Sequence, residues 1–288
     1  MNLGLHHLQL TRRRFLEAAA GGMAGALGLG LYAYEVEPHW VEIVQRSMPI
    51  RNLPQSLVGK TLLQLSDLHV GPRVDDQYLI SALERVRQLS PDILVITGDF
   101  VTYRGRETLR QLATVLDHFP QGKLGTLAAL GNHDYGRKWS QIDVADELTL
   151  RLQDRGIVVL RDQFRDVEGL RFFGLEDFWS PRFSPARALA ALDRQMPSVA
   201  LCHNPDGVDD PVWEKFQGWI LAGHTHGGQC RPPFLPPPIL PVRNKRYTAG
   251  EFELAEGRRL YINRGLGHLL QVRFNVRPEI TVFTLASS

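Results

Sequence analysis

Short apolar runs alternate with amphipathic segments along most of the chain. In the segment 76–89, apolar residues recur at Leu79, Ile80, Leu83 and Val86, and this spacing predicts a helix with one buried face. By the same criteria we expect helices at 107–119, 143–155 and 185–193, and strands at 41–50, 60–71, 91–100, 123–134, 156–160, 164–169, 170–177, 197–205 and 218–229. Strands that alternate with helices predict an α/β domain of two packed sheets with helices outside them.

The C-terminal part of the chain is rich in expected strands. The segments 246–267 and 279–286 combine alternating apolar residues with few helix formers, and Glu256–Gly257 has the composition of a turn. We therefore expect antiparallel strands that turn at Glu256–Gly257.

Polar side chains follow five of the expected strands at the point where each strand ends. They are Asp67, His69, Asp99, Asn132, His133, His203, His224 and His226. In open α/β sheets, ligands bind at the carboxyl ends of the strands. His224 and His226 alone could be solvated loop residues, but the repetition of this pattern favours one common site at the edge of the sheets.

The residue types in this set are those of a metal site. Carboxylate, imidazole and amide ligands suit divalent ions such as Mn, Fe or Zn. Thiolates at ligand spacing are absent, which argues against a structural zinc site. Two ions about 3.5–4 Å apart need a bridging carboxylate, and Asp99 lies in the middle of the set in chain order.

The first 40 residues have the order of an export signal. Arg12, Arg13 and Arg14 precede an apolar run of 17 residues, 18–34, which is at the lower limit for crossing a hydrocarbon core of about 30 Å. The stretch TRRRFL, 11–16, resembles a twin-arginine signal. No clear cleavage site follows, so the segment is either a signal or a membrane anchor. We therefore divide the chain into a leader, 1–40, and one domain, 41–288.

Composition and charge exclude several classes of protein. The chain has 288 residues, with 43% hydrophobic and 22% charged residues, typical of a globular domain. Arg12, Arg13, Arg14 and Glu17 account for its formal net charge of +2, because residues 35–288 carry 30 basic and 30 acidic residues. The folded part is therefore close to neutral and no nucleic-acid partner is expected. Two cysteines, Cys202 and Cys230, are too few for a disulfide scaffold, although a single bridge between them is compatible with the sequence.

The motifs resemble those of the calcineurin-like metallophosphoesterase superfamily. They are D-x-H at 67–69, G-D at 98–99, G-N-H-D at 131–134, His203 and G-H-x-H at 223–226. The stretches GHTHGGQ, NRGLG and PEITVFTL further resemble its bacterial branch of twin-arginine-exported phosphodiesterases, the YkuE/YaeI-like branch. The resemblance implies an α/β fold, a four-layer αββα sandwich of two mixed β-sheets flanked by helices, and a site for two divalent metal ions (Mn, Zn or Fe).

The same resemblance assigns a role to each residue of the site. By resemblance, Asp67, His69 and His226 hold one ion, Asn132, His203 and His224 hold the other, and Asp99 bridges both. His133 is expected to contact the scissile phosphate or to protonate the leaving oxygen. Asp134 either orients the imidazole of His133 or is a carboxylate of the loop turn.

These assignments predict a two-metal phosphodiesterase that acts outside the cytoplasm or at the membrane surface, after export by the twin-arginine machinery. A second enzyme hypothesis is a UDP-2,3-diacylglucosamine-type pyrophosphohydrolase, which would face the cytoplasm. A hypothesis of another class is a non-catalytic metal-binding scaffold, but such relatives lose ligands and this chain retains the whole set.

Two apolar stretches near the expected metal loops bear on the substrate. They are Phe234–Leu235 with Ile239–Leu240, in a proline-rich segment, and Leu266 with Leu269–Leu270. If these residues are exposed, they predict an amphiphilic phosphoester, such as a lipid-linked or envelope-polymer phosphate. The alternative is that both stretches pack on the core.

Overall fold

Two six-stranded sheets form the centre of the computed structural model, which describes residues 11–288. The first sheet consists, in spatial order, of β1 (Glu42–Ile50), β12 (Glu279–Ser287), β2 (Thr61–Leu65), β3 (Ile93–Thr97), β4 (Gly125–Ala129) and β5 (Val158–Val159). The second consists of β10 (Gly250–Glu253), β11 (Arg259–Ile262), β9 (Trp219–Ala222), β8 (Ser198–Leu201), β7 (Leu170–Gly174) and β6 (Gln163–Val167). Both sheets are mixed, as expected.

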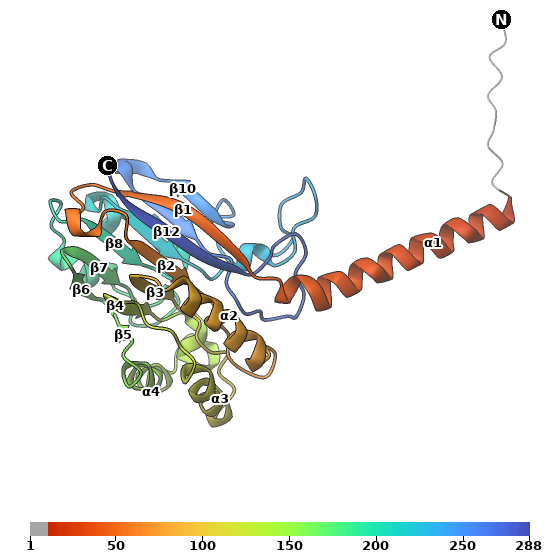
Figure 1. Cartoon of the computed structure of the whole chain (residues 1–288), viewed down its shortest axis with the longest axis horizontal. Helices are drawn as coiled ribbons and strands as arrows, with labels where there is room; N and C mark the ends of the chain where they lie inside the picture. The colour runs from red at the N-terminus through yellow and green to blue at the C-terminus, as the bar shows by residue number, and fades with distance from the viewer. Residues whose placement is uncertain (1–10) are drawn as a thin grey trace, which may run out of the picture.

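Helices cover the outer face of each sheet. The helices α2 (Asp76–Leu89), α3 (Arg106–Leu116) and α4 (Ile142–Gln153) lie along the first sheet (Figure 1). The short helix α5 (Pro185–Ala188) and 3₁₀ segments pack on the second sheet. Between the sheets lies a separate apolar layer that includes Leu62, Val95, Val199 and Leu221. The four-layer αββα arrangement predicted from the sequence is therefore confirmed.

The helix α2 shows how the local sequence produces these elements. Its apolar stripe, which includes Leu79, Leu83 and Val86, is completely or almost completely buried. Asp75 begins the helix, because its side chain accepts a hydrogen bond from the amide of Tyr78 at 2.8 Å. The helix ends where Ser90 takes a left-handed conformation, with φ of 48°. The bounds predicted from the spacing of apolar residues are confirmed.

The C-terminal strands differ in part from the expectation. β10 and β11 form an antiparallel pair that turns at Glu256–Gly257, where both residues have positive φ (61° and 75°). β12 does not extend this pair. It lies in the other sheet, parallel to β1 and antiparallel to β2, so the expectation of one antiparallel tail is wrong for this strand. A strand with most of its residues buried fits either sheet, and only tertiary packing selects one.

The helix α1 (Arg12–Leu31) extends away from the domain, and none of its residues is buried (Figure 1). It continues through short π and 3₁₀ segments to His39, and the stretch Arg12–His39 is the one helix in the described part of the chain that is long and apolar enough to cross a membrane. A signal sequence meets the same criteria. Residues 32–39 contact the domain: the amide of Arg273 donates to the carbonyl of Ala33 at 2.9 Å, and Glu37 is buried. Residues 1–10 of the predicted leader lie outside the described residues.

Candidate metal centre

The carboxyl ends of five strands supply the side chains that the sequence singled out. Asp67, Asp99 and Asn132 follow β2, β3 and β4 of the first sheet by two or three residues. His203 and His224 follow β8 and β9 of the second sheet by two residues. Because the sheets are stacked with these ends at one edge, the loops of both sheets meet there. All eight residues come together, and all but His133 are buried.

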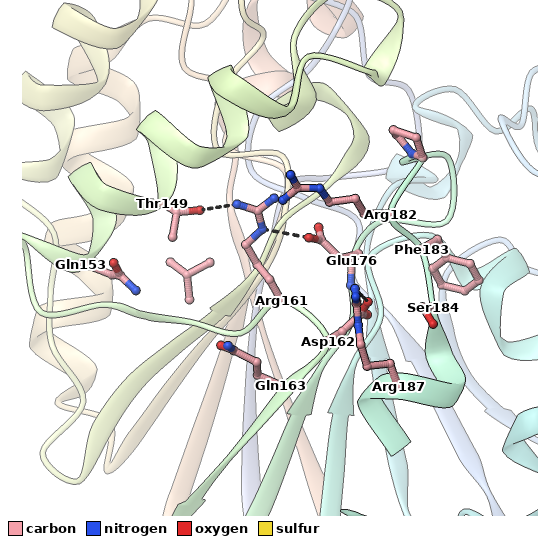
Figure 2. Close-up of a pocket in the computed structure, with 12 residues that line it drawn as sticks. Thr149, Gln153, Arg161, Asp162, Gln163, Glu176, Arg182, Phe183, Ser184 and Arg187 are labelled. Carbon is pink, nitrogen blue, oxygen red and sulfur yellow. Dashed lines mark hydrogen bonds and ion pairs between the residues drawn. The ribbon is translucent and has the colours of Figure 1, made fainter. Parts of the chain in front are cut away.

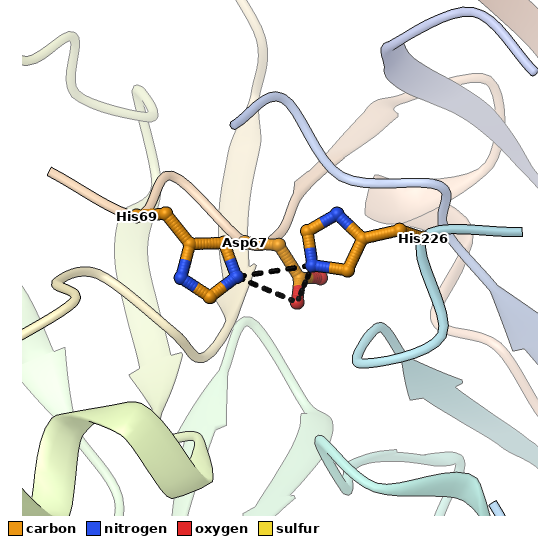
Figure 3. Close-up of side chains that lie close together, drawn as sticks. All are labelled: Asp67, His69 and His226. Carbon is orange, nitrogen blue, oxygen red and sulfur yellow. Dashed lines mark hydrogen bonds and ion pairs between the residues drawn. The ribbon is translucent and has the colours of Figure 1, made fainter. Parts of the chain in front are cut away.

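The first cluster consists of Asp67, His69 and His226 (Figure 3). The Nε2 atoms of the two histidines are 3.0 Å apart, and Oδ1 of Asp67 lies 3.2 Å from His226 Nε2 and 3.8 Å from His69 Nε2. Ligand nitrogens about 2.0–2.1 Å from one ion lie roughly this far from each other. The three atoms therefore have the spacing of ligands to one ion.

The second cluster consists of Asp99, His203 and His224. Oδ2 of Asp99 lies 3.2 Å from Nε2 of His203. Asn132 adds its Oδ1 at 2.9 Å from Nδ1 of His224. This cluster has the carboxylate, amide and imidazole atoms that suit a second divalent ion.

Asp99 lies between the two clusters. The same Oδ2 atom that lies 3.2 Å from His203 is 3.6 Å from Nε2 of His69 in the first cluster. Its other oxygen, Oδ1, accepts a hydrogen bond from the amide of His133 at 2.8 Å. One oxygen is thus fixed by the protein and the other faces both clusters, which is the geometry of a bridging carboxylate.

Hydrogen bonds on the far side of each ring hold three of the histidines in place. Nδ1 of His69 lies 2.9 Å from Oγ1 of Thr102, and Nδ1 of His203 lies 2.5 Å from the carbonyl of Thr97. Nε2 of His224 lies 2.9 Å from the carbonyl of Pro241. A histidine that donates one ring N–H in this way presents the lone pair of its other nitrogen to a metal. The tautomers that these contacts favour are those a metal requires.

Buried polar atoms without partners provide an independent test of the fit. In the part of the chain that the structure describes, Nε2 of His203 and Nδ2 of Asn132 are buried and make no hydrogen bond. Such atoms are costly in a folded protein unless a ligand satisfies them. A cation in the second cluster would satisfy His203 Nε2, so the residues present fit the metal site that their types predict.

The pKa shifts differ among the imidazoles: Asp99 outweighs the effect of burial and raises the pKa of His203, whereas two other rings shift in the direction that suits metal binding. Burial lowers the pKa of His224 to about 3 and lowers that of His69 well below its usual value, so both rings are neutral ligands at neutral pH. Burial opposes ionisation of Asp67, yet the neighbouring His226 holds the pKa of this carboxyl below its ordinary value. The site therefore contains buried carboxylates in their charged form, and these require a nearby positive charge.

The backbone at the ligands is strained. Five of the ligand residues have φ between 49° and 70°: Asp67, His69, Asp99, His224 and His226. Residues other than glycine adopt this left-handed region at a cost of about 1–3 kcal/mol each, and such strain is concentrated at functional sites.

Glycines before two of the ligands explain the G-N and G-H pairs in the sequence. A Cβ atom on Gly223 would lie 2.3 Å from Oδ2 of Asp67, and one on Gly131 would lie 2.3 Å from Oδ1 of Asp99. Each glycine thus leaves the space that a carboxylate from another strand occupies. An alanine at either position would displace a ligand.

His133 lies next to the clusters without belonging to either. Its ring is partly exposed and packs edge-on against His69, with centroids 5.0 Å apart. Asp134 does not orient this ring, because its carboxylate oxygens accept hydrogen bonds from the amides of Val101 at 3.1 Å and Gly131 at 2.9 Å. The structure therefore favours the second alternative for Asp134, a buried carboxylate that holds the loop turn.

Two tryptophans lie stacked beside the clusters, and the sequence analysis did not single them out. Trp139 and Trp179 stack with centroids 4.5 Å apart. Trp179 packs edge-on against His224 at 4.6 Å, and Trp139 lies 6.4 Å from His133. They come from the loops after β4 and β7, and no spacing in the sequence connects them. Only the fold brings them to the site.

A surface pocket of about 840 Å³ shares no lining residue with either cluster (Figure 2). It contains several arginines, which would suit an anion. However, Arg161 pairs with Glu176 at 3.0 Å and Arg187 pairs with Asp162 at 2.5 Å. Because these guanidinium groups are already paired, the pocket does not compete with the metal centre as the candidate site.

The two cysteines are both free, so the bridge that the sequence left open is not formed. Cys202 is buried beside the second cluster, and burial raises the pKa of its thiol. Cys202 therefore packs as a small apolar residue.

Comparisons with known proteins agree with this geometry. The model of the calcineurin-like phosphoesterase family matches residues 60–228. The phosphodiesterase YaeI of Escherichia coli is 31% identical over 96% of this chain and 99% of its own length. The metallophosphoesterase YkuE of Bacillus subtilis is 30% identical over 97% of this chain and 99% of its own.

Two further proteins are similar to the chain. The UDP-2,3-diacylglucosamine pyrophosphatase LpxG of Chlamydia trachomatis is 29% identical over 87% of this chain and 91% of its own length. A solved structure of a dimetal phosphatase from Danio rerio has a TM-score of 0.46 and 13% identity, and covers 73% of this chain and 88% of that one. The family match and the relatives show that the chain belongs to the calcineurin-like phosphoesterase family, and it is a metal-dependent phosphoester hydrolase.

Replacing Asp99 tests the bridging geometry. Asp99→Ala is expected to remove both ions and the activity together, because both clusters lose a shared ligand. Elemental analysis of the purified variant measures metal per chain. Asp143→Ala, at an exposed carboxylate on α4, is the control and should retain wild-type metal content. An Asp99→Ala protein that keeps two ions per chain contradicts the assignment.

Proposed function

We propose that each cluster binds one divalent ion and that the protein hydrolyses phosphodiesters at the cell envelope. The observation that carries the proposal is the position of Asp99, whose Oδ2 faces the imidazoles of both clusters. In this assignment Asp67, His69 and His226 hold one ion, and Asn132, His203 and His224 hold the other. The residue types admit Mn, Zn or Fe.

The bound ions would supply the charge that the reaction needs. Ions held by the residues of the two clusters would supply positive charge for the phosphoryl oxygens and would lower the pKa of a nearby water. The protein fixes the ligands before the substrate arrives, through the hydrogen bonds behind the rings and through the left-handed turns. This preorganisation means that the ligand positions do not have to be formed during the reaction.

We assign to His133 the action on the leaving group. It is outside both clusters, its ring is partly exposed, and its own amide holds the bridging carboxylate of Asp99. A proton delivered from this imidazole to the departing alkoxide would make the alcohol a better leaving group. We assign Asp134 to the support of this loop and give it no part in proton transfer.

An amphiphilic phosphoester is the substrate class that the surroundings favour. The similar LpxG proteins are named for a diacylated sugar nucleotide, and the described chain begins with a helix that could enter a membrane. A lipid-linked or envelope-polymer phosphate fits both observations. The UDP-2,3-diacylglucosamine-type pyrophosphohydrolase remains the second candidate, favoured if α1 stays as an anchor with the domain in the cytoplasm.

The activity is tested by turnover on a panel of substrates. Purified full-length protein with Mn²⁺ is expected to hydrolyse bis-p-nitrophenyl phosphate, to prefer it to the corresponding monoester, and to lose turnover on chelation. Restoration by added metal would show that the loss is reversible. A protein that binds two ions but hydrolyses neither diesters, monoesters nor sugar-nucleotide lipids would support the non-catalytic scaffold.

The role of His133 is tested by the choice of leaving group. His133→Asn should retain metal and slow esters of poor leaving groups by about 10²–10⁴-fold, whereas nitrophenyl esters, whose oxygen needs little protonation, should slow much less. The measurement is kcat on both esters, with His118→Asn at an exposed site as the control. Equal losses on both esters would indicate that His133 binds the phosphate instead.

The export route is tested by changing the first two of the three arginines of the leader. Replacing Arg12 and Arg13 by lysine is expected to leave the protein in the cytoplasm. A metal site built from distant strands forms only in the folded chain, which suits a pathway that transports folded proteins. Fractionation followed by immunodetection measures the distribution, and lysine at the exposed Arg106 and Arg110 is the control. Unchanged export of the double variant would exclude this route.

A further inference from the structure

A proline-rich loop, residues 231–246, presents apolar side chains directly to solvent. Phe234 is fully exposed (106%), and Ile239 and Leu235 are exposed by 73% and 59%. Leu270, on a neighbouring loop, is exposed by 58%. We call these four residues the apolar rim. Leu240 and Leu266, which belong to the same apolar stretches, are buried, so the stretches divide into a packed part and an exposed part.

The loop is held at its base while its tip stays exposed. The amide of Arg231 donates to the carbonyl of Phe274 at 2.8 Å, and Leu240 and Val242 pack in the interior. Nζ of Lys245 donates to the carbonyl of Leu240 at 2.7 Å. Five prolines between Arg231 and Leu240 restrict the backbone and cannot donate hydrogen bonds. The apolar tip therefore cannot easily fold back onto the domain.

The apolar rim lies at the end of the domain from which α1 extends. The side chain of Gln229, two residues before the proline-rich loop, donates a hydrogen bond to the carbonyl of Leu270 at 2.8 Å. This bond connects the two loops that carry the apolar rim. The next residues bind the segment that directly follows α1: the amide of Arg273 donates to the carbonyl of Ala33, and the side chain of Gln271 donates to the carbonyl of Tyr34. Figure 1 shows the loop of residues 231–246 and α1 projecting on the same side.

Two further features of this end match a lipid surface. Tyr34 and Trp40 are about half exposed where the chain enters the domain, and such aromatic side chains are enriched at membrane interfaces. The segment 231–246 also carries four basic residues, Arg231, Arg243, Lys245 and Arg246, and no acidic residue. Basic residues beside an exposed apolar group favour anionic headgroups.

We propose that the apolar rim inserts into the interfacial layer of an anionic phospholipid bilayer, beside the point where α1 enters it. The metal centre is then held close to the headgroups, because Nε2 of His224 contacts the carbonyl of Pro241 at the end of the same loop. The insertion itself does not depend on catalysis. Its consequence, access to lipid-linked phosphates, rests on the proposed function.

The test measures the depth of the rim in a membrane. Full-length protein carrying Cys230→Ser and Leu235→Cys is labelled with an environment-sensitive fluorophore, while Cys202 stays buried and unlabelled. The matched control carries the label at Leu150→Cys, because Leu150 is 62% exposed on α4, away from the rim. Both proteins are reconstituted into phosphatidylcholine–phosphatidylglycerol vesicles, and only protein that floats with the vesicles is measured.

The label at position 235 is expected to shift to shorter wavelength and to be quenched by brominated lipids at a depth of about 5–10 Å, whereas the label at 150 is expected to remain in water. An unquenched label at 235 in floated protein overturns the proposal. A second variant, Phe234→Ser with Ile239→Ser, should reduce the quenching and leave hydrolysis of a short soluble diester unchanged. Quenching that persists in this variant also counts against insertion by the rim.

The two proposals can fail separately. Absence of turnover on the soluble diester in the wild-type protein would refute the proposed function and leave the depth measurement intact. Normal turnover with an unquenched label would support the proposed hydrolase activity and refute membrane insertion of the apolar rim.

Discussion

The charge on the buried Asp99 is the constraint around which the metal centre is arranged. Asp99 is 1% exposed and lies among the imidazoles of both clusters, with a second buried carboxylate, Asp67, in the neighbouring cluster. Burying such charges without positive partners would be strongly unfavourable. Two divalent ions would compensate both carboxylates and occupy the space toward which the ligand atoms point. Metal binding would therefore stabilise the folded site.

The stacked sheets stabilise this strained arrangement. Each ligand follows a buried strand whose position is fixed by packing, so the left-handed turns at the strand ends are held by the core rather than by the loops themselves. The glycines next to the ligands allow carboxylates from other strands to approach closely. Strain, close packing and charge thus act on the same few residues, and the reacting groups are positioned before a substrate binds.

Much of this could be predicted from the sequence because the relevant signals are local. The stripe of Leu79, Leu83 and Val86 with the Asp75 cap defines α2, and apolar runs that end in Asp or His mark the ligand loops. The division of the ligands between two sheets, the place of β12 and the meeting of Trp139 with Trp179 depend on contacts distant in sequence, which local patterns do not contain. For the same reason, local sequence does not predict that Leu240 is buried whereas its neighbour Ile239 is exposed.

The most direct test of the account is the location of the metal ions themselves. Crystals of the manganese-loaded protein, measured at the manganese absorption edge, would give anomalous difference peaks at the ions. The account predicts two peaks about 3.5–4 Å apart, one among Asp67, His69 and His226 and the other among Asn132, His203 and His224, with Asp99 in contact with both. A single peak, or two peaks of which one lacks Asp99 as a ligand, would contradict it.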